Sequence, residues 1–372
     1  MKHKNKILVC TAMVGSLIYA LPSFAASDAD IVAQAKVFVQ NATQANVPWV
    51  GPTTGPAAQP NKLIVYVSSN QANGGPQEVG AAVKAAAKEI GWSFRLIDGK
   101  GDASDQDAAF SQAIALHPAG IVMGGLDAVQ SRPMIEQAVA HHIVVVGWNV
   151  ATKAGPLPED HIFYNVAQNP LDIAKAAAYY AIAKSDGKAN VVIFTTTEFS
   201  VAMEKSNEMA AIIKSCAGCS VLKTENVPLS SVQVRMPQVT AALLQKFGSK
   251  WNYSLAINDL YYDYMVPGLE AANRKGDQEP YNISAGDGSK AAFERIRSKS
   301  YQVATIAAPL ELQGWQCVDE LNRAFAGQPP ANEPDPVHII DYTSISQDGG
   351  NQSLFNPDNG YKQIFEKIWK KN

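Results

Sequence analysis

Long apolar segments are scarce in this sequence, and only one, near the start, is long enough to engage a membrane. We therefore expect a soluble mature chain. Positive charge is not concentrated either: 31 Lys and Arg stand against 34 Asp and Glu, with no basic patch or arginine-rich stretch. A nucleic-acid partner is not expected, because such proteins need a clustered positive surface.

Catalytic signatures are also missing. The sequence has no G-x-S-x-G elbow, no H-E-x-x-H helix and no Walker loop, and Asn73-Gly74-Gly75 is too short for a nucleotide fingerprint. His141 and His142 end a helical pattern, where positive charge is favourable, and we prefer this interpretation to a metal site. These absences argue against an enzyme, and we expect no cofactor and no metal.

Cysteine is sparse, with four residues in the chain. Cys216-Ala-Gly-Cys219 has the spacing of a redox pair, but it closes a helical pattern and leads into a strand. A redox pair should instead open a helix, whose N-terminus lowers the thiol pKa. We therefore favour a local structural disulfide between Cys216 and Cys219, and a buried thiol at Cys317.

The apolar run at the start has the features of an export signal. Lys2, Lys4 and Lys6 precede an uncharged segment from Ile7 to Leu21, and Ser23-Phe24-Ala25 offers a cleavage site. A membrane anchor is the alternative, but a spanning helix needs about 20 apolar residues. We predict a signal peptide at 1–25 and a periplasmic mature protein.

Residues 26–61 do not share the pattern of the rest of the chain. One amphipathic helix fits Asp30 to Ala45, and three prolines then fall between Pro48 and Pro56. Such a stretch breaks regular structure. We predict an ordered N-terminal arm that lies on the body of the protein, with Trp49 as its anchor.

From Lys62 onward, short apolar strands alternate with amphipathic helices. This alternation predicts parallel sheets covered on both faces. The first set has expected strands at 63–67, 93–97, 120–123 and 143–147, with helices at 77–90, 105–116 and 129–140. The second has strands at 190–195, 220–225, 254–258, 282–285 and 304–307, with helices at 171–184, 203–214, 237–247, 265–275 and 290–298.

A helix at 312–326, a strand at 337–342 and a helix at 361–369 complete the chain. The predicted fold class is therefore α/β, with two doubly wound parallel-sheet lobes joined by a three-segment hinge. We place the crossings near Asn165, Pro309 and Tyr342. The N-terminal lobe is then 62–165 and 309–341, and the C-terminal lobe is 166–308 and 342–372.

Over residues 62–345 the sequence resembles the type I periplasmic sugar-binding proteins, the ribose- and galactose-binding-like group. The resemblance rests on strand order and on loop motifs: Val67-Ser68-Ser69-Asn70, Gly147-Trp148-Asn149, Ile257-Asn258-Asp259, Gly286-Asp287-Gly288, and Ala304-Thr305-Ile306-Ala307 leading into Gln313-Gly314. It implies a monomeric solute-binding protein that closes about its hinge and delivers a sugar or polyol to the permease subunits of an ABC importer. Repressors with this body would need an N-terminal helix-turn-helix, which is absent.

Ligands of open α/β sheets bind beyond the carboxyl ends of the strands. Polar and aromatic side chains gather there, as sugar hydroxyls and C–H faces require. The candidate ligand-binding residues are Asn70, Gln71, Asn73, Asp127, Trp148, Asn149, Phe199, Asn258, Tyr261, Asp287 and Glu311.

Several of these candidates have structural alternatives. Asp127 is equally suited to cap the helix that follows it. For Trp148 the alternative is a place in the core, and for Asp287 it is a turn residue. For Asn258 and Asp287 the resemblance favours ligand contact, and Tyr261 is preferred to its neighbouring tyrosines.

The sequence also departs from the family. Asn73-Gly74-Gly75 stands where members carry aromatics, Asn149 replaces an arginine, and a second arginine is replaced near Glu204 and Lys205. Because carboxylates gather at the loop starts and Arg235 is the nearest arginine, we expect a neutral ligand, with a cationic one as the alternative, and not an anionic one. A receptor that presents its ligand to a membrane sensor, or a binder of another small molecule, stays open as an alternative.

Overall fold

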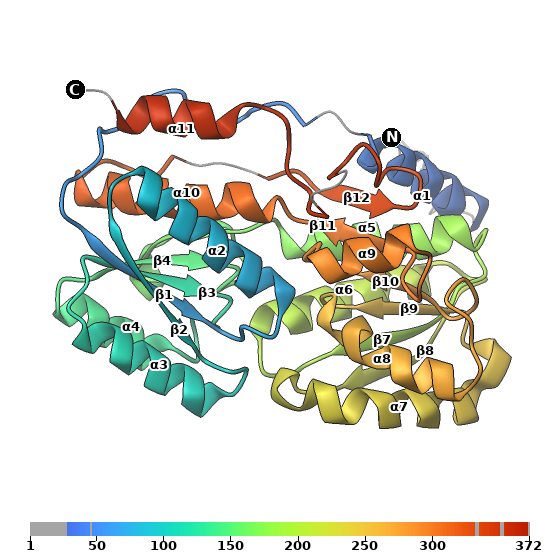
Figure 1. Ribbon diagram of the computed structural model, residues 1–372. Coiled ribbons are helices and arrows are strands. Elements are labelled where there is room, and N and C mark those ends of the chain that lie inside the picture. The colour runs from blue at the N-terminus through green and yellow to red at the C-terminus, as the bar shows by residue number, and fades with distance from the viewer. Residues whose placement is uncertain (1–27, 45–46, 332–334, 350–352, 371–372) are drawn as a thin grey trace, which may run out of the picture.

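The computed structural model describes residues 28–44, 47–331, 335–349 and 353–370. It consists of two α/β lobes side by side, each built on a six-stranded sheet (Figure 1). The strand orders are β2-β1-β3-β4-β6-β5 and β12-β11-β10-β9-β7-β8. The strands are parallel except for β5 and β12, which pair antiparallel with β6 and β11. The predicted fold class is confirmed.

The N-terminal lobe is built mainly from the first half of the chain and the C-terminal lobe mainly from the second, but helices α10 and α11 near the end of the chain belong to the N-terminal lobe. The N-terminal lobe contains β1 (Leu63–Ser68), α2 (Gly74–Glu89), β2 (Ser93–Asp98), α3 (Ala103–Ala115), β3 (Gly120–Gly124), α4 (Arg132–Ala140), β4 (Val144–Trp148), β5 (Gly155–Leu157), β6 (Ile162–Val166), α10 (Leu310–Phe325) and α11 (Tyr361–Trp369). The C-terminal lobe contains α5 (Pro170–Lys184), β7 (Asn190–Thr195), α6 (Ser200–Ser215), β8 (Ser220–Asn226), α7 (Val232–Phe247), β9 (Tyr253–Ala256), α8 (Leu260–Ala271), β10 (Tyr281–Ser284), α9 (Lys290–Arg297), β11 (Ala304–Ala307) and β12 (His338–Asp341), with α1 (Asp28–Ala42) outside it.

The central strands are apolar on both faces because helices cover both. In β1 every residue after Leu63 is buried. Helices α2 and α10 pack together over one face of the first sheet, and α3 and α4 cover the other. Local signals set where helices begin: Asn169 accepts a hydrogen bond from the backbone N–H of Leu171 and precedes Pro170, which suits the first helical position.

Two predicted lobe assignments are wrong. Strand β12 pairs with β11 of the C-terminal lobe, and its Ile339 lies in that lobe's core. The third crossing therefore lies between Phe325 and His338. Helix α11 returns to the N-terminal lobe, because Trp369 stacks on Trp315 of α10 with ring centroids 5.4 Å apart. The chain thus crosses a fourth time between Asp341 and Tyr361, and the two remaining predicted crossings fall at 167–169 and 308–309.

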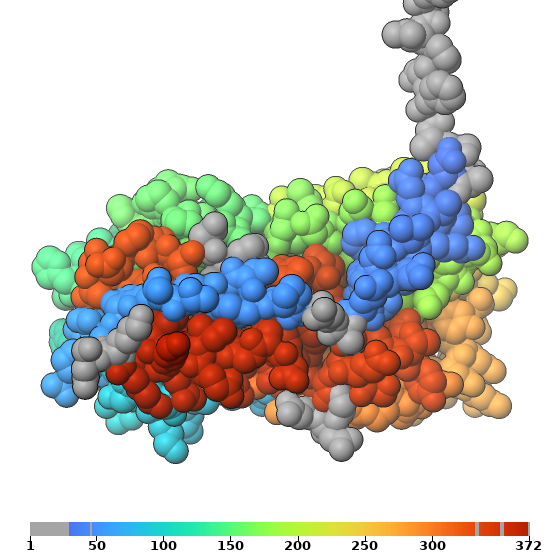
Figure 2. All heavy atoms as spheres, turned by 90° about the horizontal axis from the view of Figure 1, so that it is seen from above, coloured from blue at the N-terminus to red at the C-terminus, as the bar shows by residue number. Residues whose placement is uncertain are grey.

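The N-terminal arm touches both lobes. Helix α1 packs against α5 through Ala35 and Val39. Residues 47–61 then run as a band toward the N-terminal lobe, between α10 and α11 (Figure 2). There the ring of Trp49 meets Phe365 edge-on, with centroids 5.5 Å apart. The arm thus spans the hinge side of the molecule.

The predicted signal peptide, 1–25, lies outside the described residues. Among the residues that the structure describes, every helix is too short or too polar to cross a bilayer.

Candidate ligand-binding pocket

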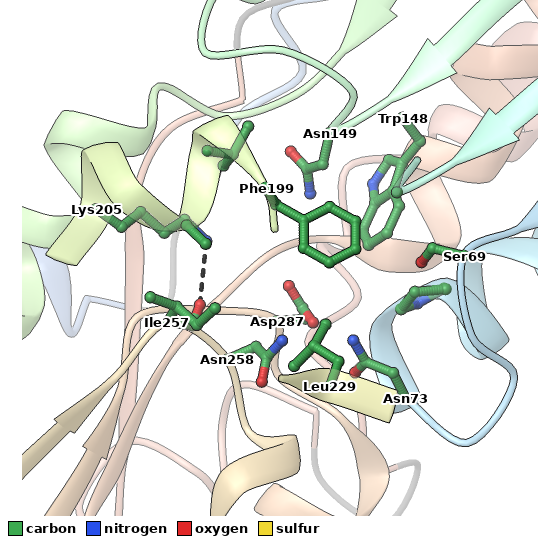
Figure 3. A pocket seen from close by; sticks show the side chains of 14 residues that line it. Ser69, Asn73, Trp148, Asn149, Phe199, Lys205, Leu229, Ile257, Asn258 and Asp287 are labelled. Carbon is green, nitrogen blue, oxygen red and sulfur yellow. Dashed lines mark hydrogen bonds between the residues drawn. The ribbon is translucent and has the colours of Figure 1, made fainter. Parts of the chain in front are cut away.

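A pocket lies between the lobes, at the carboxyl ends of strands from both sheets (Figure 3). Its empty space is about 530 Å³, including the part that is open to solvent. The N-terminal lobe lines it with Ser69, Asn73, Pro76, Gly125, Trp148 and Asn149. The C-terminal lobe lines it with Phe199, Val201, Ala202, Lys205, Leu229, Ile257, Asn258 and Asp287.

The pocket brings together Asn73, Trp148, Asn149, Phe199, Asn258 and Asp287 from the predicted set. Each comes from a loop that follows a strand or from the residue that ends one. They combine amide and carboxylate groups with flat aromatic surface, so hydroxyl and C–H groups of one small molecule can be contacted together.

Trp148 is fixed from behind. Its indole N–H donates to Oε1 of Gln313 on α10 at 2.7 Å. The amide of Gln313 in turn donates to Asp335 at 2.8 Å, and Gln316 donates to the other oxygen of that carboxylate at 3.3 Å. Because Asp335 belongs to the third crossing, this buried network joins the pocket wall to the hinge.

Lys205 is the charged lining residue that was not among the predicted ligand contacts. Its ammonium group donates to the carbonyl oxygens of Ala285 at 2.8 Å and Ile257 at 3.3 Å, just beyond β10 and β9. Burial lowers its pKa, although the nearby Asp287 opposes that shift. The position had been interpreted only as the loss of an arginine, and the structure places a cation there.

Asp287 supplies the negative charge of the pocket. Its residue surface is 8 % exposed, and burial raises the pKa of its carboxyl group from 3.8 to about 6, against the lowering effect of Lys205. Lys205 and Asp287 thus place one basic and one acidic side chain at the same pocket. The two charges offset each other, so the pocket does not select for a charged ligand.

Asn258 has an unused acceptor. Its Oδ1 is buried and has no hydrogen-bond partner within the protein, while its side chain lines the pocket (Figure 3). Leaving such a group unpaired costs about 1–3 kcal/mol. A ligand that donates a hydrogen bond to this oxygen would remove that cost.

The sequence of residues 64–329 matches the family model of the periplasmic binding protein domain. The chain belongs to this family. A search of curated proteins finds no match.

Solved structures of solute-binding proteins share the fold of this periplasmic binding protein. An ABC transporter solute-binding protein from Agrobacterium vitis with bound allitol has a TM-score of 0.64 at 20% identity, over 77% of this chain and 97% of that one. One from Mycobacterium smegmatis with bound glycerol has a TM-score of 0.67 at 17% identity, over 79% and 99%. A 5-methylthioribose transporter protein from Thermotoga lettingae TMO has a TM-score of 0.68 at 16% identity, over 82% and 97%.

Five predicted contacts do not line the pocket of this binding protein. Asn70 and Gln71 form the turn after β1: Asn70 Oδ1 accepts from the N–H of Ala72 at 2.8 Å, and the amide of Gln71 donates to Ser68 Oγ at 2.7 Å. These two groups are used locally, in the turn that precedes Asn73 and at the end of β1.

Tyr261 and Glu311 have structural roles instead. Helix α8 begins at Leu260 and turns Tyr261 into the core, where its ring stacks on Phe194 and its hydroxyl donates to the carbonyl of Val227 at 3.0 Å. Glu311 accepts hydrogen bonds from Asn356 and Lys362, and so fixes the C-terminal segment to α10. Asp127, the fifth, bridges the lobes and is described below.

Asp259 also proves to be an internal support. One carboxylate oxygen accepts from the backbone N–H groups of residues 287, 288 and 289, at 3.1, 2.8 and 3.0 Å. The other accepts from Gln302 at 2.8 Å and Thr305 at 3.0 Å. Asp259 therefore holds the turn that presents Asp287, and its own oxygens are occupied.

The predicted disulfide is confirmed. Cys216 and Cys219 are bonded, with Cα atoms 5.3 Å apart, at the junction of α6 and β8. Neither residue lines the pocket. Cys317 is buried in α10 and is not part of a disulfide.

Proposed function

We propose that this protein binds one neutral sugar or polyol between its lobes, in the periplasm, and delivers it to the membrane subunits of an ABC importer. The observation that carries the proposal is the pocket itself. It combines a buried unpaired acceptor on Asn258, a carboxylate on Asp287 and the aromatic surface of Trp148 and Phe199. A polyhydroxylated molecule offers the donors, acceptors and C–H groups that such a lining requires.

The balance of charge supports a neutral ligand. Arg235, the arginine nearest in sequence to the pocket loops, is exposed. Lys205 already donates to two carbonyl oxygens, and the Asp287 carboxylate stands at the same pocket. An anionic ligand would have to lose its hydration next to that carboxylate, which is unfavourable. Neutral hydroxyls can instead donate to Asp287 in charge-assisted hydrogen bonds.

The ligands bound in similar solved structures suggest which compounds to test first. These ligands, allitol, glycerol and 5-methylthioribose, are uncharged and carry several hydroxyl groups. Isothermal titration of the chain from residue 26 against these three compounds, arabinose and galactose should find one binder with a micromolar or lower Kd. Ribose 5-phosphate serves as the anionic control.

Two results would contradict the proposal. Titrations without heat or thermal stabilisation across the whole neutral panel would remove the sugar or polyol assignment. Tight binding of ribose 5-phosphate, unchanged in the Asp287→Asn variant, would show that the charge of the pocket has been misjudged.

A further inference from the structure

The two lobes touch each other at the rims of the pocket, where several hydrogen bonds join them, including Gln130 to the carbonyl of Glu198 and Lys290 to Glu78. One further contact is a two-bond pair. Asp127, which follows β3 of the N-terminal lobe, reaches Ser200, the first residue of α6 in the C-terminal lobe. Oδ2 of Asp127 accepts from the backbone N–H of Ser200 at 2.8 Å and from its hydroxyl at 2.6 Å. We call this pair the Asp127 clasp.

The two carboxylate oxygens of Asp127 have separate tasks. Oδ1 accepts from the N–H groups of Val129 at 2.9 Å and Gln130 at 3.2 Å, within its own lobe. Those bonds do not depend on the other lobe, whereas both bonds to Oδ2 join the two lobes. The side chain is 4 % exposed and does not line the pocket. Its charge also faces the N-terminus of α6, where a negative charge is favourable.

At the opposite rim of the pocket the aspartate comes from the C-terminal lobe and the helix from the N-terminal lobe. Asp287 of the C-terminal lobe lies against the start of α2 in the N-terminal lobe, where a Cβ at Gly75 would overlap its Oδ2. A Cβ at Gly74 would likewise collide with Ser289. Each lobe thus sets an aspartate against the start of a helix of the other lobe, α6 for Asp127 and α2 for Asp287, but only Asp287 also lines the pocket. The Asp127 clasp is therefore the one of the two whose carboxylate stands apart from the ligand-lining residues.

We propose that the Asp127 clasp holds the closed form and sets the rate of ligand release, without contacting the ligand. This inference rests on the proposed binding function. Asp127 is accordingly a positioning residue: breaking the clasp should accelerate dissociation equally for every ligand, because it changes the closed population and not the pocket.

The chain supplies a closely matched control. Asp102 accepts from the N–H and hydroxyl of Ser104 at 2.9 and 2.7 Å, the same pair of contacts, but within one lobe at the start of α3. Asp127→Asn and Ser200→Ala can therefore be compared with Asp102→Asn and Ser104→Ala. Asn keeps an oxygen acceptor for the cap at residue 129 and removes the charge.

The first measurement needs no ligand. Spin labels at Ala108→Cys on α3 and Ala241→Cys on α7, two exposed positions, report the separation of the lobes. Helices α3 and α7 lie on the side of their lobes away from the hinge (Figure 1). In the chain from residue 26, the native cysteines are disulfide-bonded (Cys216 and Cys219) or buried (Cys317). We expect a closed population in the ligand-free protein that decreases in Asp127→Asn and Ser200→Ala and is unchanged in both controls. A fully open ligand-free parent, or equal effects of clasp and control variants, would overturn the proposal.

The second measurement uses the binders found among arabinose, galactose, allitol, glycerol and 5-methylthioribose. Asp127→Asn should raise the dissociation rate about tenfold and change the association rate much less, since charge-assisted hydrogen bonds are lost only on opening. Losses that differ between ligands would mark Asp127 as a ligand contact and refute the clasp. If none of the five compounds binds, the proposed function fails, while the ligand-free distances still decide whether the clasp exists.

Discussion

The two lobes contribute to the pocket in different ways. The N-terminal lobe lines it with neutral groups, among them Asn73, Trp148 and Asn149, while both charged residues, Lys205 and Asp287, come from the C-terminal lobe. The neutral wall is fixed from behind by Gln313, and the charged wall is fixed by backbone carbonyls and by the turn around Asp259. One lobe therefore determines mainly shape, and the other mainly polarity.

The largest expected effect is on the charged wall. Asp287→Asn keeps the shape and removes the charge, so charge-assisted bonds from ligand hydroxyls are lost and affinity should fall about a hundredfold. Titration calorimetry measures this, with Asp277→Asn, an exposed carboxylate of the same lobe, as the control. Equal affinities of the Asp287 variant and the wild type would mean that Asp287 does not contact the ligand.

The same residue predicts a dependence on pH. With a pKa of about 6, most Asp287 side chains are protonated at pH 5 and ionised at pH 7. Affinity for a hydroxyl donor should therefore be about tenfold weaker at pH 5 than at pH 7, and Asp287→Asn should abolish the difference. A pH-independent affinity in the wild type would contradict this assignment.

The stability of the ligand-free protein should change with pH in the opposite direction. Burial raises the pKa values of Asp287 and Asp335 from 3.8 to about 6. Between these values the folded chain binds more protons than the unfolded chain, so the free energy of unfolding decreases as pH rises. Denaturant unfolding at pH 4.5 and 7 measures this contribution, and Asp335→Asn should reduce it.

On the neutral wall, Gln313→Leu should have a smaller effect on binding and a clear one on stability. It leaves the indole N–H of Trp148 without its acceptor and takes a donor from Asp335. We expect about fivefold weaker binding and a loss of about 2 kcal/mol in the free energy of unfolding. Gln316→Leu, which removes only the other donor to Asp335, is the control, and it should leave affinity unchanged.

The disulfide should have the smallest effect of all on binding. Cys216 and Cys219 lie outside the pocket, so reduction should leave affinity unchanged and lower the free energy of unfolding by about 2 kcal/mol, as the chain-entropy relation gives for so short a loop. Alkylation and mass spectrometry under denaturing, non-reducing conditions should label Cys317 alone. A change in affinity on reduction would show that the C-terminal wall depends on this bond.

The fold was readable from the sequence because buried parallel strands appear as short apolar runs. Strands β5 and β6 were missed: Pro156 and Pro158 interrupt that region, and their pairing depends on a hairpin rather than on periodicity. The lobes of β12 and α11 were misassigned because a strand or helix pattern does not reveal which distant surface it joins.

The pocket residues could be predicted from the sequence only in part, for similar reasons. Residues directly after a strand, such as Asn258 and Asp287, could be placed at the pocket because strand ends meet there. Lys205 could not, because it lies inside α6 and a lysine in a helix usually faces solvent. Tyr261 followed the strand-end rule only until α8 began one residue before it and turned its ring into the core.

The N-terminal arm imposes an order on how the molecule is completed. Asn322 accepts from the N–H of Gln59, 263 positions away, and Arg323 donates to the carbonyl of Thr54, 269 positions away. A chain synthesised from its N-terminus therefore presents the arm long before α10 and α11 exist. Residues 47–61 are thus made early, yet their contacts with α10 and α11 form only late, whereas α1 can already pack against α5. Removal of α11 should leave Trp49 without its ring contact.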